Sequence, residues 1–255
     1  MRRAVAALLA AVAACAPAGI APSTTDCSAH FASTAEPRIV DAKLASSTRR
    51  VCFRAFAVLH SGVSRTPLWV AERLTRVSVE RARALDTRDN RFHPEERLPP
   101  DERAELADYR GSGFDRGHMA PSGDMGSPED DFESFSLANI VPQNGALNRG
   151  GWADMENYVR DLAGKLGEAY VVTGPAFLGG SVRRLNGRVL VPTHVWKAMH
   201  VPGQGAGAWI ATNDAEAAWE VVSIAELTRR TGVNPFPMLD AAARAKVPAF
   251  PTFED

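Results

Sequence analysis

The chain has 255 residues, of which 45% are hydrophobic and 23% are charged, and this composition excludes a disordered, a collagen-like or a coiled-coil protein. Its length is sufficient for one full-sized domain or two small ones. The formal net charge of −1 gives no overall basic footprint for nucleic acid, yet arginines are frequent between residues 73 and 116, so charge alone does not decide whether the chain binds phosphate.

The N-terminal residues 1–21 have the pattern of a secretory signal. Arg2 and Arg3 precede the apolar run AVAALLAAVAAC, which is too short to cross a bilayer and is followed by small residues. Alternatively, the letters VAAC resemble a bacterial lipobox, in which case Cys15 becomes a lipid-anchored N-terminus. Both interpretations predict a secreted or periplasmic protein with a single domain over residues 22–255. No later segment is long enough to span a membrane.

The cysteine count agrees with export. If Cys15 belongs to the leader, Cys27 and Cys52 remain as a pair in an oxidising compartment. We therefore expect a disulfide between them. The alternative, two unrelated buried thiols, is left open by the sequence.

The first half of the chain predicts a hairpin followed by a long loop. Residues Arg50–Gly62 are rich in β-branched and aromatic side chains, as a strand is, and Thr66–Thr75 is its expected partner across a turn at Ser61-Gly62. The polar stretch Ala82–Ser112 is rich in Arg, Asp and Pro. We expect it to form a long surface loop with short helical turns, which in a compact domain is usually functional or flexible.

The second half predicts strands and two helices. The expected strands are Ser134–Gln143, Glu168–Phe177, Arg188–Val201 and Gly207–Asn213. The expected helices are Trp152–Gly167, with apolar residues at helical spacing and a terminal glycine, and Ser223–Gly232, with a serine cap. This order of elements predicts an α+β domain built around a mainly antiparallel sheet.

Two segments concentrate polar side chains suited to catalysis. The stretch GFDRGHMAPSGDM places Asp115, Arg116 and His118 around a glycine, just before Ala120-Pro121. We expect this stretch to bend so that the base His118 and the cation Arg116 lie on either side of one bound group. Asn148, Trp152, Glu156 and Arg160 follow at i,i+4 steps and would share one face of a helix that begins near Asn148. Gly150 and Gly151 instead favour a special backbone start there.

These segments resemble the DNA/RNA non-specific endonuclease family. The resemblance rests on an ordered set of motifs: DRGH at Asp115–His118, NIVPQ at Asn139–Gln143 and LNRGGW…E at Leu147–Glu156. The four letters DRGH alone are a weak match, whereas the ordered set is specific, and the resemblance covers roughly residues 52–236. It implies a ββα-metal active site and an exported, Mg²⁺-dependent endonuclease that hydrolyses DNA, RNA or both.

The resemblance also implies roles for individual residues. His118 would be the general base, because imidazole titrates near neutrality and a nearby cation favours its neutral form. Asn148 would be the direct ligand of Mg²⁺, or of Mn²⁺ in its place, since Mg²⁺ commonly keeps several of its waters. Glu156 would hold metal-bound waters from the same side.

The remaining family positions are assigned to positioning and to phosphate binding. Asn139 would help to position the site, and Arg116 and Arg160 would contact the scissile phosphate or its neighbours. A further arginine lies upstream, and both Arg88 and Arg91 fit it. Asp115 would hold the bend in place by accepting hydrogen bonds from backbone amides.

Other enzyme classes lack their signatures in this chain. The sequence contains no Gly-x-Ser-x-Gly of a serine hydrolase and no His-Glu-x-x-His of a zinc protease. The alternative that remains is an exported nucleic-acid-binding module of the same fold that does not cut. The sequence does not decide between DNA and RNA, and it leaves the oligomeric state unknown.

Overall fold

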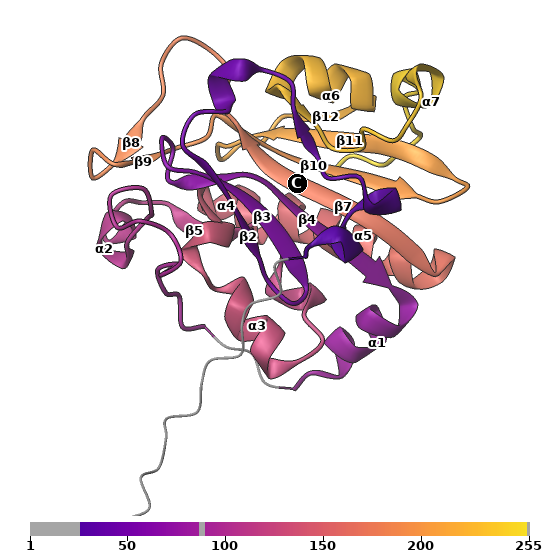
Figure 1. Ribbon diagram of the computed structural model, residues 1–255, viewed down its shortest axis with the longest axis horizontal. Coiled ribbons are helices and arrows are strands. Elements are labelled where there is room, and N and C mark those ends of the chain that lie inside the picture. Colours follow the sequence, from indigo (N-terminus) through magenta and orange to yellow (C-terminus); the bar gives the residue numbers. More distant parts are fainter. Residues whose placement is uncertain (1–25, 87–89, 254–255) are drawn as a thin grey trace, which may run out of the picture.

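A seven-stranded antiparallel sheet is the centre of the fold in a computed structural model that describes residues 26–86 and 90–253 (Figure 1). The strands lie in the order β12-β11-β10-β7-β4-β3-β2. Their bounds are β2 Thr48–Cys52, β3 Phe56–Ser61, β4 Thr66–Thr75, β7 Glu168–Ala176, β10 His194–Val201, β11 Gly205–Thr212 and β12 Trp219–Val222. The expected α+β class with a mainly antiparallel sheet is confirmed. The leader predicted over residues 1–21 lies outside the described residues.

Each face of the sheet has its own hydrophobic core because successive side chains of a strand point to opposite faces. In β10, Val195 and Met199 pack on one face, while Trp196 and Ala198 pack on the other. The first face is covered by α1 (Arg76–Ala84) and α5 (Gly151–Leu166), and the second by α6 (Ile224–Thr231) (Figure 1). The segments that carry the predicted site residues pack on the first of these faces.

The two predicted long helices are confirmed, each within one residue of its expected ends. In α5, Trp152, Met155, Val159 and Ala163 form a buried stripe, and Gly167 ends the helix with φ of 100°. The helix α6 begins after Ser223, whose side chain accepts a hydrogen bond from the Glu226 amide, and it ends at Gly232 in the left-handed region.

Smaller elements surround the sheet. Three two-stranded ribbons pair β1 (Arg38–Ile39) with β13 (Val233–Asn234), β5 (Asp115–His118) with β6 (Ile140–Gln143), and β8 (Arg184–Leu185) with β9 (Val189–Leu190). The short α-helices are α2 (Leu106–Tyr109), α3 (Pro128–Ser134), α4 (Gly145–Arg149) and α7 (Ala241–Ala245). Single 3₁₀ turns are η1 (Ser28–His30), η2 (Ala32–Thr34), η3 (Ala42–Leu44), η4 (Ser122–Asp124) and η5 (Leu137–Asn139).

Several predicted boundaries were wrong. The stretch Arg50–Gly62 is two strands, β2 and β3, because the chain turns at residues 53–55, where the Phe53 amide donates to the Phe56 carbonyl. The stretch Arg188–Val201 is interrupted before β10, since Pro192 has no amide hydrogen to donate to a ladder. Only the last four residues of Ser134–Gln143 form a strand, and the predicted loop Ala82–Ser112 begins inside α1. The short helical turn expected in this loop is present as α2.

The expected disulfide is present. Cys27 and Cys52 are bonded, with 5.6 Å between their Cα atoms, so the first turn of the described chain is fixed to β2 at the sheet edge. Both cysteines are buried in the core of the second face. Among the residues that the structure describes, no helix is long and apolar enough to cross a membrane.

Candidate active site

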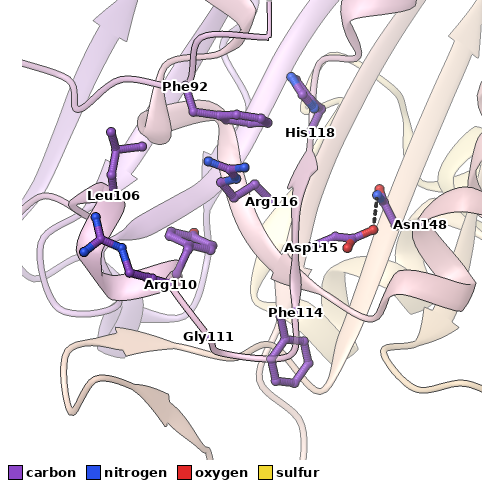
Figure 2. Close-up of a pocket in the computed structure, with 10 residues that line it drawn as sticks. Phe92, Leu106, Arg110, Gly111, Phe114, Asp115, Arg116, His118 and Asn148 are labelled. Atoms are coloured by element: carbon purple, nitrogen blue, oxygen red, sulfur yellow. Dashed lines mark hydrogen bonds between the residues drawn. The ribbon is translucent and has the colours of Figure 1, made fainter.

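The DRGH segment is a strand, and the chain bends only after it, at Met119-Ala120, so the prediction that the bend itself presents Arg116 and His118 was wrong. Residues Asp115–His118 form β5 and pair antiparallel with β6, with His118 opposite Ile140. Gly117 faces Gln143 so closely that a Cβ would lie 2.0 Å from the side-chain oxygen, which explains the glycine. Because alternate residues of a strand point the same way, Arg116 and His118 both face one pocket (Figure 2).

The imidazole of His118 is held by aromatic rings. Its ring centre lies 4.7 Å from that of Phe135 and 5.4 Å from that of Phe92. Its Nε2 is buried without a hydrogen-bond partner among the described residues. Burial, and secondly the charge of Arg116, lower the pKa of His118 to about 4, so the imidazole is neutral at pH 7. The sequence predicted a lowered pKa for His118, but it attributed the shift to nearby positive charge rather than to burial.

Arg116 presents its positive charge to the pocket. Its side chain is exposed, and the guanidinium carbon lies 4.0 Å from the centre of the Phe92 ring, which orients the group (Figure 2). Within residues 26–86 and 90–253, no carboxylate lies within salt-bridge distance of Arg116. The guanidinium is therefore available to an anion.

Asn148 reaches the same pocket from α4. This helix begins directly after β6, where the Asn144 side chain caps it by accepting from the Ala146 amide. The Asn148 Nδ2 donates to Asp115 Oδ2 over 3.0 Å, and Arg149 Nη1 donates to the same oxygen over 2.6 Å. Asp115 therefore orients the Asn148 amide, with the amide oxygen turned away from the carboxylate (Figure 2). The Asp115 carboxylate accepts these two side-chain bonds and none from a backbone amide of the described residues, so the predicted bonds to backbone amides were wrong.

The two glycines after Asn148 end one helix and begin another. Gly150 has φ of −101° and ψ of −120°, which is not helical, so α4 ends at Arg149 and α5 begins at Gly151. A Cβ on Gly151 would lie 2.2 Å from the Phe253 carbonyl oxygen. The special backbone start that the glycines favoured is confirmed, whereas the single helix carrying both Asn148 and Glu156 was wrong.

Asn139 supports the strand that carries His118. Its side chain is fully buried, and its Nδ2 donates to the carbonyl oxygens of Ala120 and Ser134, each over 2.8 Å. Its Oδ1 accepts from the Ala120 amide over 2.9 Å. These bonds fix the backbone immediately after His118, so Asn139 lies behind the pocket and does not line it.

Behind the pocket lies a group of charged residues that we call the buried charge cluster. It consists of Glu72 on β4, Asp124 on η4, Glu156 and Arg160 on α5, and Lys197 on β10. Arg160 Nε donates to Asp124 Oδ1 over 2.5 Å, and both side chains are largely buried. The structure therefore places Arg160 in an ion pair and not in the pocket lining.

The buried charge cluster shifts the protonation of its carboxyl groups. Burial raises the pKa of Glu156 to about 7, and the negative charge of Asp124 adds to this while Lys197 opposes it. Burial and Asp124 also raise the pKa of Glu72 well above its ordinary value. Lys197 Nζ donates to Thr173 Oγ1 over 2.7 Å and to the Met119 carbonyl over 3.3 Å, which links the cluster to the residue after His118.

Sequence reasoning missed the inner members of this cluster, although a signal was present. Lys197 is the one lysine or carboxylate within the strand HVWKAMHV, and Glu72 is the buried charge of TPLWVAERLT, whose other charge, Arg73, is exposed. A charge in such a run is rarely buried without a partner. The partner could not be identified because it lies far away in the sequence.

The pocket has a volume of about 710 Å³, and the predicted site residues Arg116, His118 and Asn148 line it (Figure 2). It is lined by Phe92, Leu106, Tyr109, Arg110, Gly111, Phe114, Asp115, Arg116, His118 and Asn148. Glu156, Asn139 and Arg160 do not line it. Arg91 is exposed, with its guanidinium 5.3 Å from the Phe132 ring centre, and Arg88 lies outside the described residues. Sequence reasoning did not identify the apolar and arginine side chains at the far end of the pocket.

Comparison with known sequences gives a consistent family. Residues 36–242 match the family model described as DNA/RNA non-specific endonuclease. Nuclease C1 of Cunninghamella echinulata var. echinulata is 38% identical over 177 residues, which are 63% of this chain and 70% of that protein. The mitochondrial Nuclease EXOG of Xenopus laevis is 35% identical over 206 residues, covering 72% of this chain but only 57% of the relative.

Comparison with solved structures agrees. A chain in the crystal structure of the EndoG/EndoGI complex, described as showing the mechanism of EndoG inhibition, superposes with a TM-score of 0.69 at 27% identity. The match covers 76% of this chain and 88% of that one. The likeness therefore extends over most of both chains.

Proposed function

Because this chain belongs to the DNA/RNA non-specific endonuclease family, we propose that it is an exported, divalent-metal-dependent endonuclease that hydrolyses phosphodiester bonds of DNA, RNA or both. One observation carries the proposal: β5 and α4 bring His118, Arg116 and Asn148 to the wall of one pocket. A neutral base, a cation without a carboxylate partner and an oriented amide are the groups that phosphodiester hydrolysis requires.

His118 acts as the general base. Its Nε2 is buried without a hydrogen-bond partner among the described residues, and we assign to this imidazole the proton of the attacking water. The pKa of about 4 supports this role because an imidazole must be neutral to accept a proton. The rings of Phe92 and Phe135 hold the base in one orientation.

The residues around Asn148 fit a hard divalent ion. The amide nitrogen of Asn148 is bonded to Asp115, which leaves the amide oxygen as a ligand, and oxygen ligands suit Mg²⁺ or Mn²⁺. The described residues contain no cluster of three or more His, Cys, Asp or Glu side chains able to hold an ion, so a site here depends on water and substrate phosphate for its other ligands. When bound, the ion would stabilise charge on the scissile phosphate and the leaving oxygen.

Other residues position these groups. Arg116 contacts the phosphate, and Asn139 fixes the backbone behind His118. Glu156, whose pKa of about 7 lets it be a carboxylate or a neutral acid near neutrality, lies outside the pocket lining and would act on the site through water. Arg160 acts through Asp124 rather than on phosphate directly, and Arg88 or Arg91 supplies the upstream phosphate contact.

Export accounts for the disulfide. Cys27 and Cys52 are bonded, as is common outside reducing compartments. Residues 1–21 would be a removable leader, or a lipobox ending at Cys15 would make that cysteine the lipid-anchored N-terminus. Relatives named as mitochondrial nucleases show that members of the family also occur in an organelle.

A nuclease assay tests the proposal. The purified protein, incubated with plasmid DNA and with RNA, should cut at internal positions in Mg²⁺ and stop cutting in EDTA. If wild-type protein binds nucleic acid but never cuts it with any divalent ion, the protein is the binding module of the same fold and the proposed activity is wrong.

A further inference from the structure

The far end of the pocket is built differently from the end that holds His118. Phe114 lies one residue before β5, on a loop in which Gly111 and Gly113 have φ of 65° and 81°. Its ring is half-buried and packs on a small core that contains Leu185, Val189 and Tyr109. In Figure 2 this ring lies at the opposite end of the pocket from His118. The Phe114 ring is therefore held against this small core and stays partly exposed to solvent.

Arginines flank this apolar surface. The guanidinium carbon of Arg183, in the segment before β8, lies over the Phe114 ring, 5.1 Å from its centre. Arg110 lines the same pocket on the side of Leu106 (Figure 2). Neither of these exposed side chains has a carboxylate within salt-bridge distance among the described residues. The lining contains one carboxylate, that of Asp115, and Arg149 already neutralises it.

The ribbon that directly follows Arg183 is fixed in place. Arg188, directly before β9, forms an ion pair with the buried Asp108 on α2 at 3.2 Å, and Asn186 donates to the same carboxylate. These contacts join the β8-β9 ribbon to the helix that precedes Arg110. Arg110, Phe114 and Arg183 are thus presented from elements that are tied together.

We propose that Phe114, Arg110 and Arg183 form a subsite for one unpaired nucleotide next to the scissile phosphate, with its base on Phe114 and its phosphate at the two arginines. Aromatic rings alternating with arginines are the chemistry that binds single-stranded nucleic acid, because every base has a stacking face. In a duplex that face is covered by the neighbouring base pairs, and exposing it requires unstacking. The subsite, which rests on the proposed nuclease function, therefore favours single-stranded substrates over duplex ones.

The test compares substrates as well as variants. Wild type, Phe114→Ala, Phe114→Tyr, Arg183→Gln and Arg38→Gln are assayed on a 20-nucleotide DNA strand, the RNA strand of the same sequence and the blunt DNA duplex. Arg38 is the control, since it is exposed on β1, outside the pocket, and has no carboxylate partner among the described residues. Thermal unfolding of each variant shows that it is folded.

The expected result is a KM for the single strand that rises roughly tenfold in Phe114→Ala, in line with the loss of one stacked base, and returns in Phe114→Tyr. Arg183→Gln should also raise the KM for the single strand, whereas Arg38→Gln should leave it unchanged. In all of these variants the KM for the duplex should change less than about twofold. A rise confined to DNA or to RNA assigns the subsite to that strand. An unchanged single-strand KM in both Phe114→Ala and Arg183→Gln, or an equal rise for the duplex, overturns the subsite. Wild-type protein that cuts no substrate overturns the proposed function instead.

Discussion

At the scale of single residues, His118 owes its chemistry to two phenylalanines. An imidazole in water would be partly protonated near pH 6.5, but the rings at 4.7 and 5.4 Å remove the solvent that would stabilise the imidazolium. The pKa of about 4 keeps it able to accept a proton over the whole neutral range. A loss of activity between pH 8 and 5 would therefore have to come from another group, and Glu156, with a pKa of about 7, is the one we expect.

Replacing His118 tests its role as the base. We expect His118→Ala to lower kcat by about 10²–10⁴-fold while KM changes little, because a neutral imidazole contributes no charge to phosphate binding. His93→Ala is the matched control, since His93 is also a half-buried histidine stacked on a phenylalanine, Phe132, but it does not line the pocket. Retained kcat with a strongly raised KM would make His118 a phosphate contact.

Asn148 and Asp115 should act as one unit in holding the metal ion. We expect Asn148→Ala to abolish most cleavage without unfolding the protein, and Asp115→Asn to weaken Mg²⁺ binding by a smaller factor, because the amide then loses its orienting carboxylate. Calorimetric titration with Mg²⁺ measures both effects directly. Arg149→Gln is the control, since it keeps the bond between Asp115 and Asn148. Unchanged Mg²⁺ affinity in Asn148→Ala would mean that the ion is held elsewhere.

At the scale of elements, the ion pair of Asp124 and Arg160 joins η4 to α5 behind the pocket. Both side chains are largely buried, so removing one charge leaves the other without compensation. We expect Arg160→Met to lower the free energy of unfolding by about 3–5 kcal/mol. Chemical denaturation measures this loss, and Asp124→Asn combined with Arg160→Met should recover part of it.

An exposed pair on the same helix is the control for this measurement. Arg83 on α1 and Asp161 on α5 also form an ion pair, but more than half of each side chain is exposed. Arg83→Met should therefore cost less than about 1 kcal/mol. If Arg160→Met leaves stability unchanged and only raises KM, then Arg160 serves the phosphate after all.

Sequence patterns predicted the elements whose signals are local. The caps Ser223 and Gly232 and the stripe from Trp152 to Ala163 lie within single helices, so they could be read without the fold. The strand β5 could not, because four residues that include Gly117 have little strand character, and only pairing with β6 makes them a strand. The same holds for Lys197, whose partners are distant in sequence.

At the scale of the whole molecule, the disulfide joins the N-terminal turn to the edge of the sheet. Cys27 and Cys52 are 25 residues apart in the sequence, and closing a loop of this size in the unfolded chain contributes about 3.5 kcal/mol in the chain-entropy model. We expect Cys27→Ala together with Cys52→Ala to lower the free energy of unfolding by about that amount. Nuclease activity should persist below the unfolding transition, because neither cysteine touches the pocket. Equal stability with and without the bond would contradict this expectation.

The buried carboxyl groups make the stability of the whole protein depend on pH. Burial raises the pKa of Glu156 from 4.5 to about 7 and that of Glu72 in the same direction, so the folded state binds protons that the unfolded state releases. The free energy of unfolding should therefore fall as pH rises from about 4.5 towards 7, by on the order of 3 kcal/mol for Glu156. His118 acts oppositely, since its lowered pKa removes stability as pH falls from 6.5 towards 4.

Glutamine substitution separates these contributions. Denaturation of wild type, Glu156→Gln and His118→Ala is measured in EDTA between pH 4 and 9, so that only protons are linked to folding. Glu156→Gln should gain stability relative to wild type as pH rises from about 4.5 to about 7, because glutamine carries no charge to desolvate. His118→Ala should differ from wild type mainly below pH 6.5. If the Glu156→Gln and wild-type curves run parallel from pH 4 to 9, the pKa of Glu156 is not raised by folding, and the loss of activity near neutral pH must come from a different group.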